Sequence, residues 1–197
     1  MELLAQAVLE KITIPLEASG RHVHVTQTQA WTLFGHDLTP ERDLSQPGQF
    51  LARERVTITG PKGEFENVAV LGPARKAAQV EISLTDGRML GISPPVRLSG
   101  DTAGSPGCTL TGPAGSVTLA EGVIAAKRHI HVHPRDAQRL GVSDRQVVKL
   151  QTFTARPTTF EDVSVRISPD FFTAAHLDYD EANACGFVKD DRGRILL

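Results

Sequence analysis

Cysteine is scarce in this sequence, and long hydrophobic runs are missing from it. Among the 197 residues there are 2 cysteines, Cys108 and Cys185, and they form no Cys-x-x-Cys pair. Two isolated thiols argue against a disulfide-rich secreted scaffold and favour a reducing, intracellular compartment. No apolar segment approaches the roughly 20 residues needed to cross a bilayer, so we expect no membrane span and a cytoplasmic location.

An excess of charge of either sign is also lacking. The formal net charge is −2, which gives no basic surface of the kind that nucleic-acid-binding domains present. Hydrophobic residues make up 40% of the chain, enough to build a core and too many for a disordered protein. The length fits one large domain or two small ones. We therefore expect a folded protein that binds neither nucleic acid nor a membrane.

Several signatures of common enzyme classes do not occur. The sequence has neither G-x-G-x-x-G nor G-x-x-x-x-G-K-[ST], and no long helices alternate with its strand-like segments, which argues against Rossmann and P-loop folds. It has no G-x-S-x-G elbow, and neither cysteine stands beside a histidine motif. A nucleophilic serine or cysteine is therefore not indicated.

What the sequence does contain is one histidine motif written twice. Residues 21–25 read RHVHV and residues 128–132 read RHIHV, and these two segments hold four of the 7 histidines. The residues after them also correspond, because each motif is followed by a stretch that predicts a short helix ending at a glycine, Gly35 or Gly141. This internal similarity predicts two duplicated units.

The remainder of the chain is typical of short β strands. Segments rich in Val, Ile and Thr often alternate apolar and polar positions, and Gly, Pro, Asp and Asn interrupt them at intervals of roughly ten residues. This rhythm predicts a mainly β protein of antiparallel barrels or sandwiches with a few short helices. A domain boundary is predicted near residues 121–127, and residues 1–11 are predicted to form a separate amphipathic helix or arm.

On a β strand the two histidines of each motif share one face. Alternate side chains point the same way, so the Cβ atoms of His22 and His24 lie roughly 6.5–7 Å apart, as do those of His129 and His131. Two imidazoles at that spacing can converge on one metal ion. A single pair of this kind is more often an ordinary half-exposed surface, but two copies in duplicated units favour metal binding.

A metal site needs further ligands, and two residues elsewhere are candidates. His176 lies in an acidic stretch, and Glu81 is a carboxylate within a strand-like segment, where carboxylates are disfavoured. Imidazoles with a carboxylate suit Zn²⁺, with Co, Mn and Fe as alternatives. His133 would extend the second row to three if its strand continued that far. Arg75 has the planar fork that fits phosphate or carboxylate.

Longer motifs of the chain resemble one family. These are SGRHVHVT, LTPERDLSQPGQF, FENVAVLGPARKAAQVEIS, GSVTLAEGVIAAKRHIHVHP and HLDYDEANACG. Together they are similar to the PduL-type phosphotransacylases, or phosphate propanoyltransferases, in the same order over residues 12–188. The resemblance implies two similar small β-barrel domains with short capping helices and the active site between them. It places the first barrel at residues 12–126 and the second at 127–197, with the strand at 12–18 joining the second barrel.

The resemblance also implies two zinc ions and a set of site residues. One zinc would be held by His22, His24 and Glu81 together with the sulfur of coenzyme A, and the second by His129, His131 and His176. Arg75 would clamp the phosphate as the catalytic residue. The positions near coenzyme A would be Ser19, Arg42, Leu71 and Asn183. Many relatives have a basic residue where Ala69 stands, so one contact to a coenzyme A phosphate is expected to be missing.

The implied reaction is acyl-CoA + phosphate ⇌ acyl phosphate + CoA, with short acyl chains such as propanoyl or acetyl. The missing nucleophile motifs favour direct attack of phosphate on the thioester, with no acyl-enzyme. Two alternatives stay open. One is a dinuclear zinc hydrolase of thioesters or phosphoesters, which would not need phosphate, and the other is a non-enzymatic zinc-binding β-barrel module.

The expected partners follow from the same resemblance. Acyl-CoA, CoA and phosphate would be the small-molecule partners. A homodimer is expected as the commonest oligomeric state of soluble enzymes. Family members occur inside bacterial microcompartments, as in 1,2-propanediol degradation, so shell or core enzymes of such a compartment are further expected partners.

Overall fold

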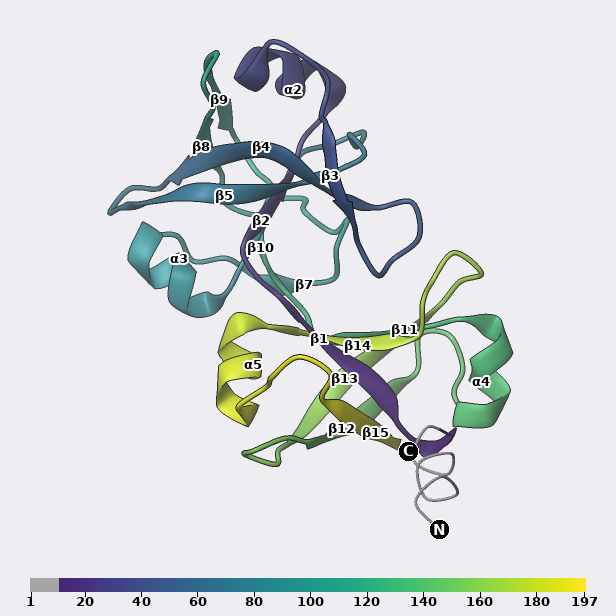
Figure 1. Cartoon of the computed structure of the whole chain (residues 1–197). Helices are drawn as coiled ribbons and strands as arrows, with labels where there is room; N and C mark the ends of the chain where they lie inside the picture. The colour runs from purple at the N-terminus through teal and green to yellow at the C-terminus, as the bar shows by residue number, and fades with distance from the viewer. Residues whose placement is uncertain (1–10) are drawn as a thin grey trace. The chain divides into compact units, whose positions relative to one another are not determined.

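The computed structural model describes residues 11–197, and within them the chain forms two compact units (Figure 1). The predicted N-terminal arm lies, apart from its last residue, outside the described residues. One unit, here called the barrel unit, contains Lys127–Leu197 together with the described residues up to Ser19. The other, the half-barrel unit, is formed by Gly20–Ala126. Strands dominate both units, which confirms the prediction of a mainly β protein.

A closed six-stranded barrel forms the barrel unit. Around it the strands follow the order β1, β14, β11, β13, β12 and β15, and β15 pairs back with β1. Their bounds are β1 (Ile14–Ser19), β11 (His129–Val132), β12 (Val147–Phe153), β13 (Thr159–Ile167), β14 (Ala174–Asp178) and β15 (Arg192–Leu196). Apolar side chains such as Ile130, Leu150 and Val165 fill its core. Burying each of them contributes about 1.5–3 kcal/mol, which stabilises the strands that carry the histidines.

The half-barrel unit is a curled sheet of nine strands. Eight of them follow the order β7, β10, β6, β2, β5, β4, β8 and β9, and β3 pairs with β4. Their bounds are β2 (His22–His24), β3 (Pro40–Asp43), β4 (Phe50–Thr59), β5 (Glu64–Gly72), β6 (Gln79–Ile82), β7 (Val96–Arg97), β8 (Cys108–Thr111), β9 (Ser116–Leu119) and β10 (Val123–Ala126). Its core packs fully buried side chains such as Val23, Ile58 and Leu110. The chain therefore contains one closed barrel and one half barrel.

Each histidine strand follows a strand that belongs to the other unit. β1 runs directly into β2, yet β1 pairs with β14 and β15 of the barrel unit. β10 runs directly into β11, yet β10 pairs with β6 and β7 of the half-barrel unit. The chain thus passes from one unit to the other between Ser19 and Gly20, and it returns between Ala126 and Lys127.

The prediction of antiparallel sheets is wrong, because both sheets are mixed. β2 pairs in parallel with β5, and β11 pairs in parallel with β13. Parallel neighbours need a crossover instead of a tight turn. The first crossover contains α2 (Gln27–Phe34), β3 and β4, and the second contains α4 (Pro134–Leu140) and β12. The sequence rhythm shows where strands end but not in which direction they pair.

The helix after each histidine strand begins with a cap and ends at the predicted glycine. α2 follows Thr26, whose side-chain oxygen accepts the backbone N–H of Gln29 in a capping box. It ends at Gly35, which has a φ of 79°, and α4 ends at Gly141, which has a φ of 68°. Glycine adopts this left-handed conformation without steric cost. Both predicted helix ends are confirmed.

The two units share more than the histidine motif. β5 contains the segment FENVAV, and β13 contains the similar segment FEDVSV. Asn67 and Asp162 hold the same place in these segments, and both have a positive φ, of 56° and 54°. A short helix follows the next antiparallel neighbour of each histidine strand, namely α3 (Leu84–Leu90) after β6 and α5 (Tyr179–Cys185) after β14. The similarity between the units therefore includes the histidine strand, the two short helices and two neighbouring strands.

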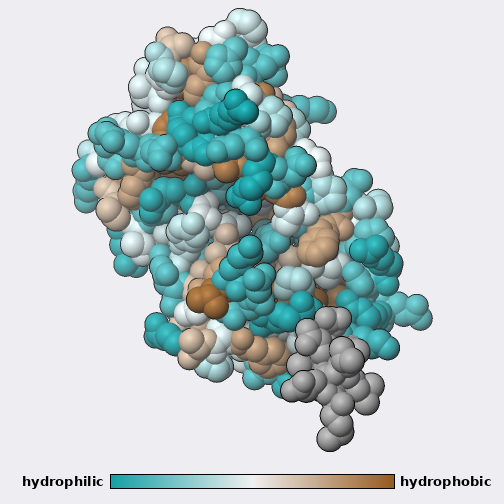
Figure 2. Space-filling model, in the orientation of Figure 1, coloured by the Kyte–Doolittle hydropathy of each residue, from teal (hydrophilic) through white to brown (hydrophobic). Residues whose placement is uncertain are grey.

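Hydrophilic side chains predominate on the face drawn in Figure 2, and hydrophobic ones are scattered among them. The larger exposed apolar side chains belong to different elements, for example Trp31 on α2 and Met89 on α3. Within residues 11–197 no helix is long and apolar enough to span a membrane.

Candidate metal centres

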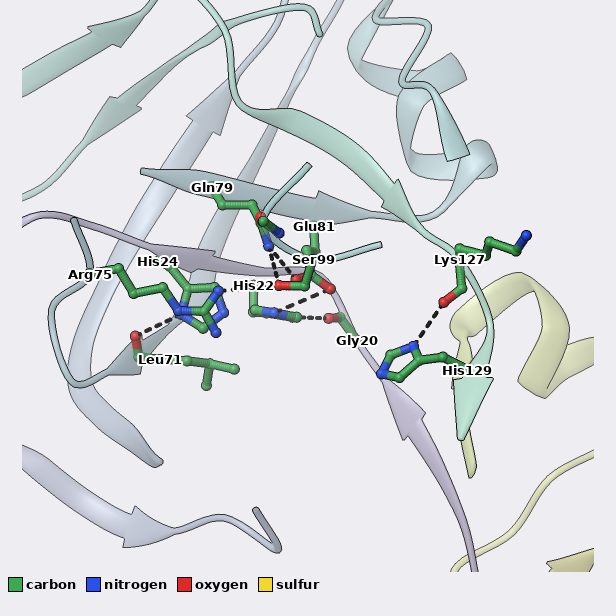
Figure 3. Close-up of polar contacts among 11 residues, drawn as sticks. Gly20, His22, His24, Leu71, Arg75, Gln79, Glu81, Ser99, Lys127 and His129 are labelled. Carbon is green, nitrogen blue, oxygen red and sulfur yellow. Dashed lines mark hydrogen bonds and ion pairs between the residues drawn. The ribbon is translucent and has the colours of Figure 1, made fainter. Parts of the chain in front are cut away.

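β2 presents two histidines on one face of the half-barrel sheet. Val23 and Val25 pack in the core with none of their surface exposed, so the alternating side chains of His22 and His24 point to the other face. Both histidines are nevertheless buried, at 7% and 2% exposed. The two imidazoles therefore lie together on one face of this short strand, as predicted (Figure 3).

Glu81 lies directly opposite His22 on the neighbouring strand. β6 pairs antiparallel with β2, and the register places Glu81 across from His22. Oε2 of Glu81 is 3.7 Å from Nε2 of His22, and the ring centroids of His22 and His24 are 5.1 Å apart. One ligand atom from each of the three residues lies within 4.8 Å of the other two. The sheet thus gathers three possible metal ligands that are distant in sequence.

Backbone carbonyls orient both imidazoles. Nδ1 of His22 lies 2.8 Å from the carbonyl oxygen of Gly20, and Nδ1 of His24 lies 3.2 Å from that of Leu71 (Figure 3). A carbonyl oxygen only accepts, so each Nδ1 carries the hydrogen and donates it. Nε2 is then the atom left for a metal ion on both rings.

Hydrogen bonds hold the Glu81 carboxylate in turn. The side-chain amide of Gln79 donates to Oε1 of Glu81 at 2.5 Å and to Oγ of Ser99 at 2.8 Å. The oxygen of the same amide accepts the backbone N–H of Gly100 at 2.7 Å, which fixes the amide orientation. Arg75 donates to Oγ of Ser99 at 3.2 Å. The predicted catalytic arginine and the predicted carboxylate ligand therefore belong to one hydrogen-bond network (Figure 3).

Burial and mutual charge shift the pKa values in this cluster. Burial lowers the pKa of His24 to about 3, and the positive charges of His22 and Arg75 act in the same direction. Burial also disfavours a charged His22, but the Glu81 carboxylate outweighs this effect and raises the pKa of His22. Burial opposes ionisation of Glu81, yet the two histidines outweigh it and lower its pKa. The carboxylate therefore favours a proton on His22, which a bound metal ion would displace.

β11 and β14 build a second cluster, in the barrel unit. The register places His176 opposite His129, and His131 follows on the same face of β11. One ligand atom from each of these histidines lies within 4.8 Å of the other two. Ring centroids are 5.0 Å apart for His129 and His176, and 4.7 Å apart for His129 and His131. Phe171 stacks on His131 at a centroid distance of 3.9 Å and covers one face of that imidazole.

Two kinds of acceptor face the imidazoles of the second cluster. Nδ1 of His129 lies 2.8 Å from the carbonyl oxygen of Lys127 (Figure 3). Nδ1 of His176 instead lies 3.5 Å from Oε2 of Glu17 on β1. His129 is thus held in the same way as the histidines of the first cluster, whereas His176 faces a carboxylate.

The third member occupies the same place in both clusters. Glu81 and His176 each lie opposite the first histidine of their motif, on the antiparallel neighbour of the histidine strand. Each also stands two positions before a helix cap, Ser83 for α3 and Asp178 for α5. The two segments around them, QVEIS and AAHLD, share no identical residue. The two units therefore share the position of this residue but not its type, which is a glutamate in one unit and a histidine in the other.

The residues predicted near coenzyme A fall into two pairs. Ser19 is paired with Asp178 across β1 and β14, and Asn183 is exposed on α5, the helix that Asp178 caps. Arg42 on β3 and Leu71 on β5 lie opposite the same residue of β4. The first pair belongs to the barrel unit and the second to the half-barrel unit.

His133 has a structural position of its own. β11 ends at Val132, so the row of histidines does not extend to His133. His133 caps α4 instead, with its Nδ1 accepting the backbone N–H of Arg135 at 3.1 Å. Pro134 occupies the first helical position, where a missing N–H costs nothing.

Sequence patterns did not reveal the residues that hold the candidate ligands in place. Ser99 and Glu17 belong to none of the motifs. Gln79 lies within the segment FENVAVLGPARKAAQVEIS, but single polar residues in strand-like segments are usually surface positions. Arg21 and Arg128 were visible, since each begins one copy of the histidine motif. Each forms an ion pair at 2.7 Å with an acid on the helix after the third ligand candidate. The repetition of this arginine in both motifs indicates that it has a role beside the histidines.

The donor sets fit a divalent metal ion such as zinc. Each cluster offers three nitrogen or oxygen ligands of the kinds that bind zinc, and each is largely buried. Catalytic zinc sites usually have three protein ligands and one open position. The fold and these sites define a duplicated β protein with two candidate metal centres whose composition suits catalysis.

Comparison with known proteins then gives the family. The family model for phosphate propanoyltransferase matches residues 15–188. A phosphate propanoyltransferase of Enterococcus faecalis is 55% identical over 186 residues, covering 93% of this chain and 88% of that protein. Those of Listeria monocytogenes (54% over 197 residues; 99% and 92% covered) and Thermotoga maritima (53% over 169 residues; 84% and 80% covered) are similar as well. The chain belongs to the phosphate propanoyltransferase family and is an enzyme, a phosphate acyltransferase, which confirms the resemblance.

Proposed function

We propose that the protein is a zinc-dependent enzyme that interconverts a short-chain acyl-CoA and phosphate with an acyl phosphate and CoA. Propanoyl-CoA is the first proposed substrate, because the relatives carry the name phosphate propanoyltransferase, and acetyl-CoA is the second. The pair of buried three-residue clusters is the observation that carries the zinc dependence. The proposed ligands are His22, His24 and Glu81 for one ion, and His129, His131 and His176 for the other.

The composition of the clusters supports catalytic zinc more than structural zinc. Each cluster offers three candidate protein ligands, whereas structural sites usually have four. Bound zinc would act as a Lewis acid toward the thioester carbonyl and the departing sulfur of CoA. The burial of the candidate ligands would limit access of bulk water, which would strengthen electrostatic interactions and protect an acyl phosphate from hydrolysis.

Arg75 is the proposed phosphate clamp. Its guanidinium donates to Ser99, which also accepts from Gln79, so the side chain is positioned within the network around Glu81. A guanidinium can bind phosphate through two parallel hydrogen bonds. Arg75 would thereby hold phosphate in an orientation for attack, and the gain would come from proximity rather than from a covalent bond to the protein.

Direct attack of phosphate on the thioester is the proposed route. A phosphate oxygen would form a bond to the carbonyl carbon, the carbon–sulfur bond would break, and CoA would leave as its thiolate. An acyl-enzyme would need an accessible nucleophile, and both cysteines are buried. Burial raises the pKa of Cys108 to about 12 and also raises the pKa of Cys185. Neither thiol is therefore suited to act as a thiolate at neutral pH.

The proposed contacts to coenzyme A are Ser19, Arg42, Leu71 and Asn183. The exposed charge of Arg42 suits a phosphate of CoA, whereas Ala69 offers no charge. A homodimer, and an association with shell or core enzymes of a microcompartment, are the proposed assemblies.

A coupled assay tests this function. CoA release from propanoyl-CoA would be followed with and without phosphate, before and after chelation, while zinc is quantified. We expect release that requires phosphate, disappears on chelation and returns with zinc. Release without phosphate would identify a zinc hydrolase, and metal binding without turnover would identify a binding module. Accumulation of acylated protein would contradict direct attack.

A further inference from the structure

The two clusters differ in the position of their carboxylate. In the half-barrel unit Glu81 is one of the three ligand candidates, whereas the barrel unit gathers three imidazoles. A carboxylate nevertheless stands beside the second cluster, where Oε2 of Glu17 lies 3.5 Å from Nδ1 of His176. We propose that Glu17 is a positioning residue that orients His176 to bind metal through Nε2 and supplies the negative charge that its three histidines lack. This inference rests on the metal binding in the proposed function.

The strand register builds this contact. β1 pairs in parallel with β14, and Glu17 and His176 are partners in that ladder. His176 is buried, and 28% of the Glu17 side chain is exposed. A carboxylate in such a partly buried place interacts more strongly with its neighbour than one in bulk water. The contact is therefore set by the backbone of two paired strands and not by a mobile surface side chain.

Three of the other candidate histidines show which role the Glu17 carboxylate would have at His176. Nδ1 of His22, of His24 and of His129 each lies within 3.2 Å of a backbone carbonyl oxygen. At His176 the oxygen that faces Nδ1 belongs to Glu17. A carboxylate that accepts from Nδ1–H selects the same tautomer as a carbonyl does. In addition, it makes Nε2 a stronger donor to a metal ion.

The duplicated unit provides an internal comparison. β10 pairs in parallel with β6 as β1 does with β14, and the residue opposite Glu81 is Ile124. Glu17 opposite His176 in the barrel unit thus corresponds to Ile124 opposite Glu81 in the half-barrel unit. Each cluster has one carboxylate, among the ligand candidates in one unit and next to a ligand candidate in the other. A divalent ion bound to either cluster would therefore lie near one carboxylate, Glu81 in the half-barrel unit or Glu17 in the barrel unit.

The test uses the full-length chain in two backgrounds. Zinc affinity of the barrel unit is measured by competition with a chromophoric chelator in the variant His24→Ala/Glu81→Ala, which disables the other cluster. Adding Glu17→Ala is expected to weaken binding about tenfold or more. Glu17→Gln keeps an accepting oxygen and is expected to lose less. In the reciprocal background, His129→Ala/His131→Ala, the change Glu17→Ala is expected to leave zinc affinity unaltered.

A spectroscopic measurement separates orientation from general stability. Two-bond ¹H–¹⁵N spectra of the metal-free chain report which ring nitrogen of His176 carries the hydrogen. We expect Nδ1–H in the native chain and in Glu17→Gln, and a loss of this preference in Glu17→Ala. Glu161→Gln removes the same charge from an exposed acid of the barrel unit and is the matched control, which should alter neither the tautomer nor the zinc affinity.

Unchanged zinc affinity of the barrel unit in Glu17→Ala would overturn the inference, and so would an equal loss in both backgrounds. A tautomer of His176 that does not depend on residue 17 would overturn it as well. A native chain that binds no zinc would instead overturn the proposed function, and the NMR result would still decide whether Glu17 orients His176.

Discussion

At the scale of single residues, Arg75 is the side chain on which the proposed reaction depends most directly. It is partly buried and donates to Ser99, next to the network that holds Glu81. We expect Arg75→Ala to lower activity at limiting phosphate about tenfold or more, because hydrogen bonds to a charged group are lost. Zinc content should stay native, since Arg75 is not among the ligand candidates. Initial rates at varied phosphate and elemental analysis measure the two quantities.

Two further variants make the Arg75 test specific. Lys76→Ala removes an exposed positive charge at the adjacent position and should leave the phosphate dependence unchanged. Arg75→Lys keeps the charge but not the planar fork, so it should recover only part of the activity. A native phosphate dependence in Arg75→Ala would remove this residue from the mechanism.

The buried thiol of Cys108 leads to a prediction about pH. Burial raises its pKa to about 12, so the reactive thiolate forms only at very high pH in the folded chain. Between pH 7 and 9 we expect alkylation of Cys108 by iodoacetamide to stay slow in the folded chain. In the unfolded chain it should accelerate, because an unperturbed thiol titrates near about 8.5. Mass spectrometry measures both rates, and fast labelling of the folded chain would show that this thiol is accessible.

The candidate ligands could be predicted from sequence, whereas their supporting residues could not. His22 and His24 share a face because of the two-residue period of a strand, and that period is visible in the sequence. Glu17 acts through strand pairing, which brings distant segments together and leaves no local pattern. Gln79 lies two positions before Glu81 on the same strand, but its contacts with Ser99 and Gly100 join it to a distant segment. The pairing also explains why Glu81 was a weaker candidate than the histidines until its place opposite His22 was known.

At the scale of elements, an arginine connects each histidine strand to the helix after the third ligand candidate. Arg21 donates to Asp86 on α3, and Arg128 donates to Glu181 on α5, both at 2.7 Å. Each acid uses its other oxygen to accept the backbone N–H of the residue that caps its helix. Each guanidinium also lies over a phenylalanine of the FENVAV or FEDVSV segment, at 4.0 and 5.8 Å from the ring centroid. The same connection therefore occurs twice.

We expect Arg21→Gln and Arg128→Gln each to lower the free energy of unfolding by about 1–2 kcal/mol, because an acid loses its charged partner. Asp86 is only 4% exposed, so water cannot easily replace that partner. Urea denaturation measures the change. Lys149→Gln removes the exposed pair with Glu161 and should lower the free energy of unfolding less than either arginine variant. Equal, small effects in all three variants would show that the two arginines are ordinary surface charges.

The end of a helix could be predicted where a single residue determines it. The direction in which two strands pair could not, because it depends on a segment distant in the sequence. Gly35 and Gly141 end their helices because glycine enters the left-handed region readily, a property of the residue itself. The parallel pairing of β2 with β5 and of β11 with β13 depends on how a whole crossover folds back. No short sequence pattern records that path.

At the scale of the whole molecule, each unit contains a strand that comes directly before the histidine strand of the other unit. β1 precedes β2 but belongs to the barrel unit, and β10 precedes β11 but belongs to the half-barrel unit. β1 lies between β14 and β15 in the closed barrel. Residues 127–197 alone would leave both of those strands with open edges. β1 and β15 run antiparallel with Ile14 opposite Gly193, so the chain before β1 lies near the end of β15. A short turn could join these two strands as a hairpin.

We therefore expect a circularly permuted barrel unit to fold without the half-barrel unit. It would run from Lys127 to Leu197, continue through a short glycine-containing turn and end with residues 12–19. Circular dichroism should show a strand-rich chain with cooperative thermal unfolding, whereas residues 127–197 alone should stay largely unfolded. Leu16→Asp in the permuted chain should abolish folding, because Leu16 is 3% exposed in the barrel core. A native-like barrel formed by residues 127–197 alone would contradict the expected role of β1.

Each cluster takes all three of its ligand candidates from one unit, so the two proposed metal ions should be lost one at a time. We expect the native chain to bind two zinc ions, and His24→Ala and His131→Ala to bind one each. Activity should fall about a hundredfold or more in both variants, because the proposed reaction uses both ions. Elemental analysis after dialysis and the coupled CoA assay measure the two properties. His36→Ala, at a histidine with 57% of its side chain exposed, should keep both ions and full activity.

The combination of metal content and rate is what makes this last experiment decisive. Loss of both ions in either single variant would mean that the clusters do not bind independently, although their ligands are separate. One remaining ion with native activity would assign the reaction to a single cluster, and the other cluster would then be a structural site despite its three-ligand composition. One remaining ion with little activity is the result expected if duplication produced two metal centres that the reaction requires together.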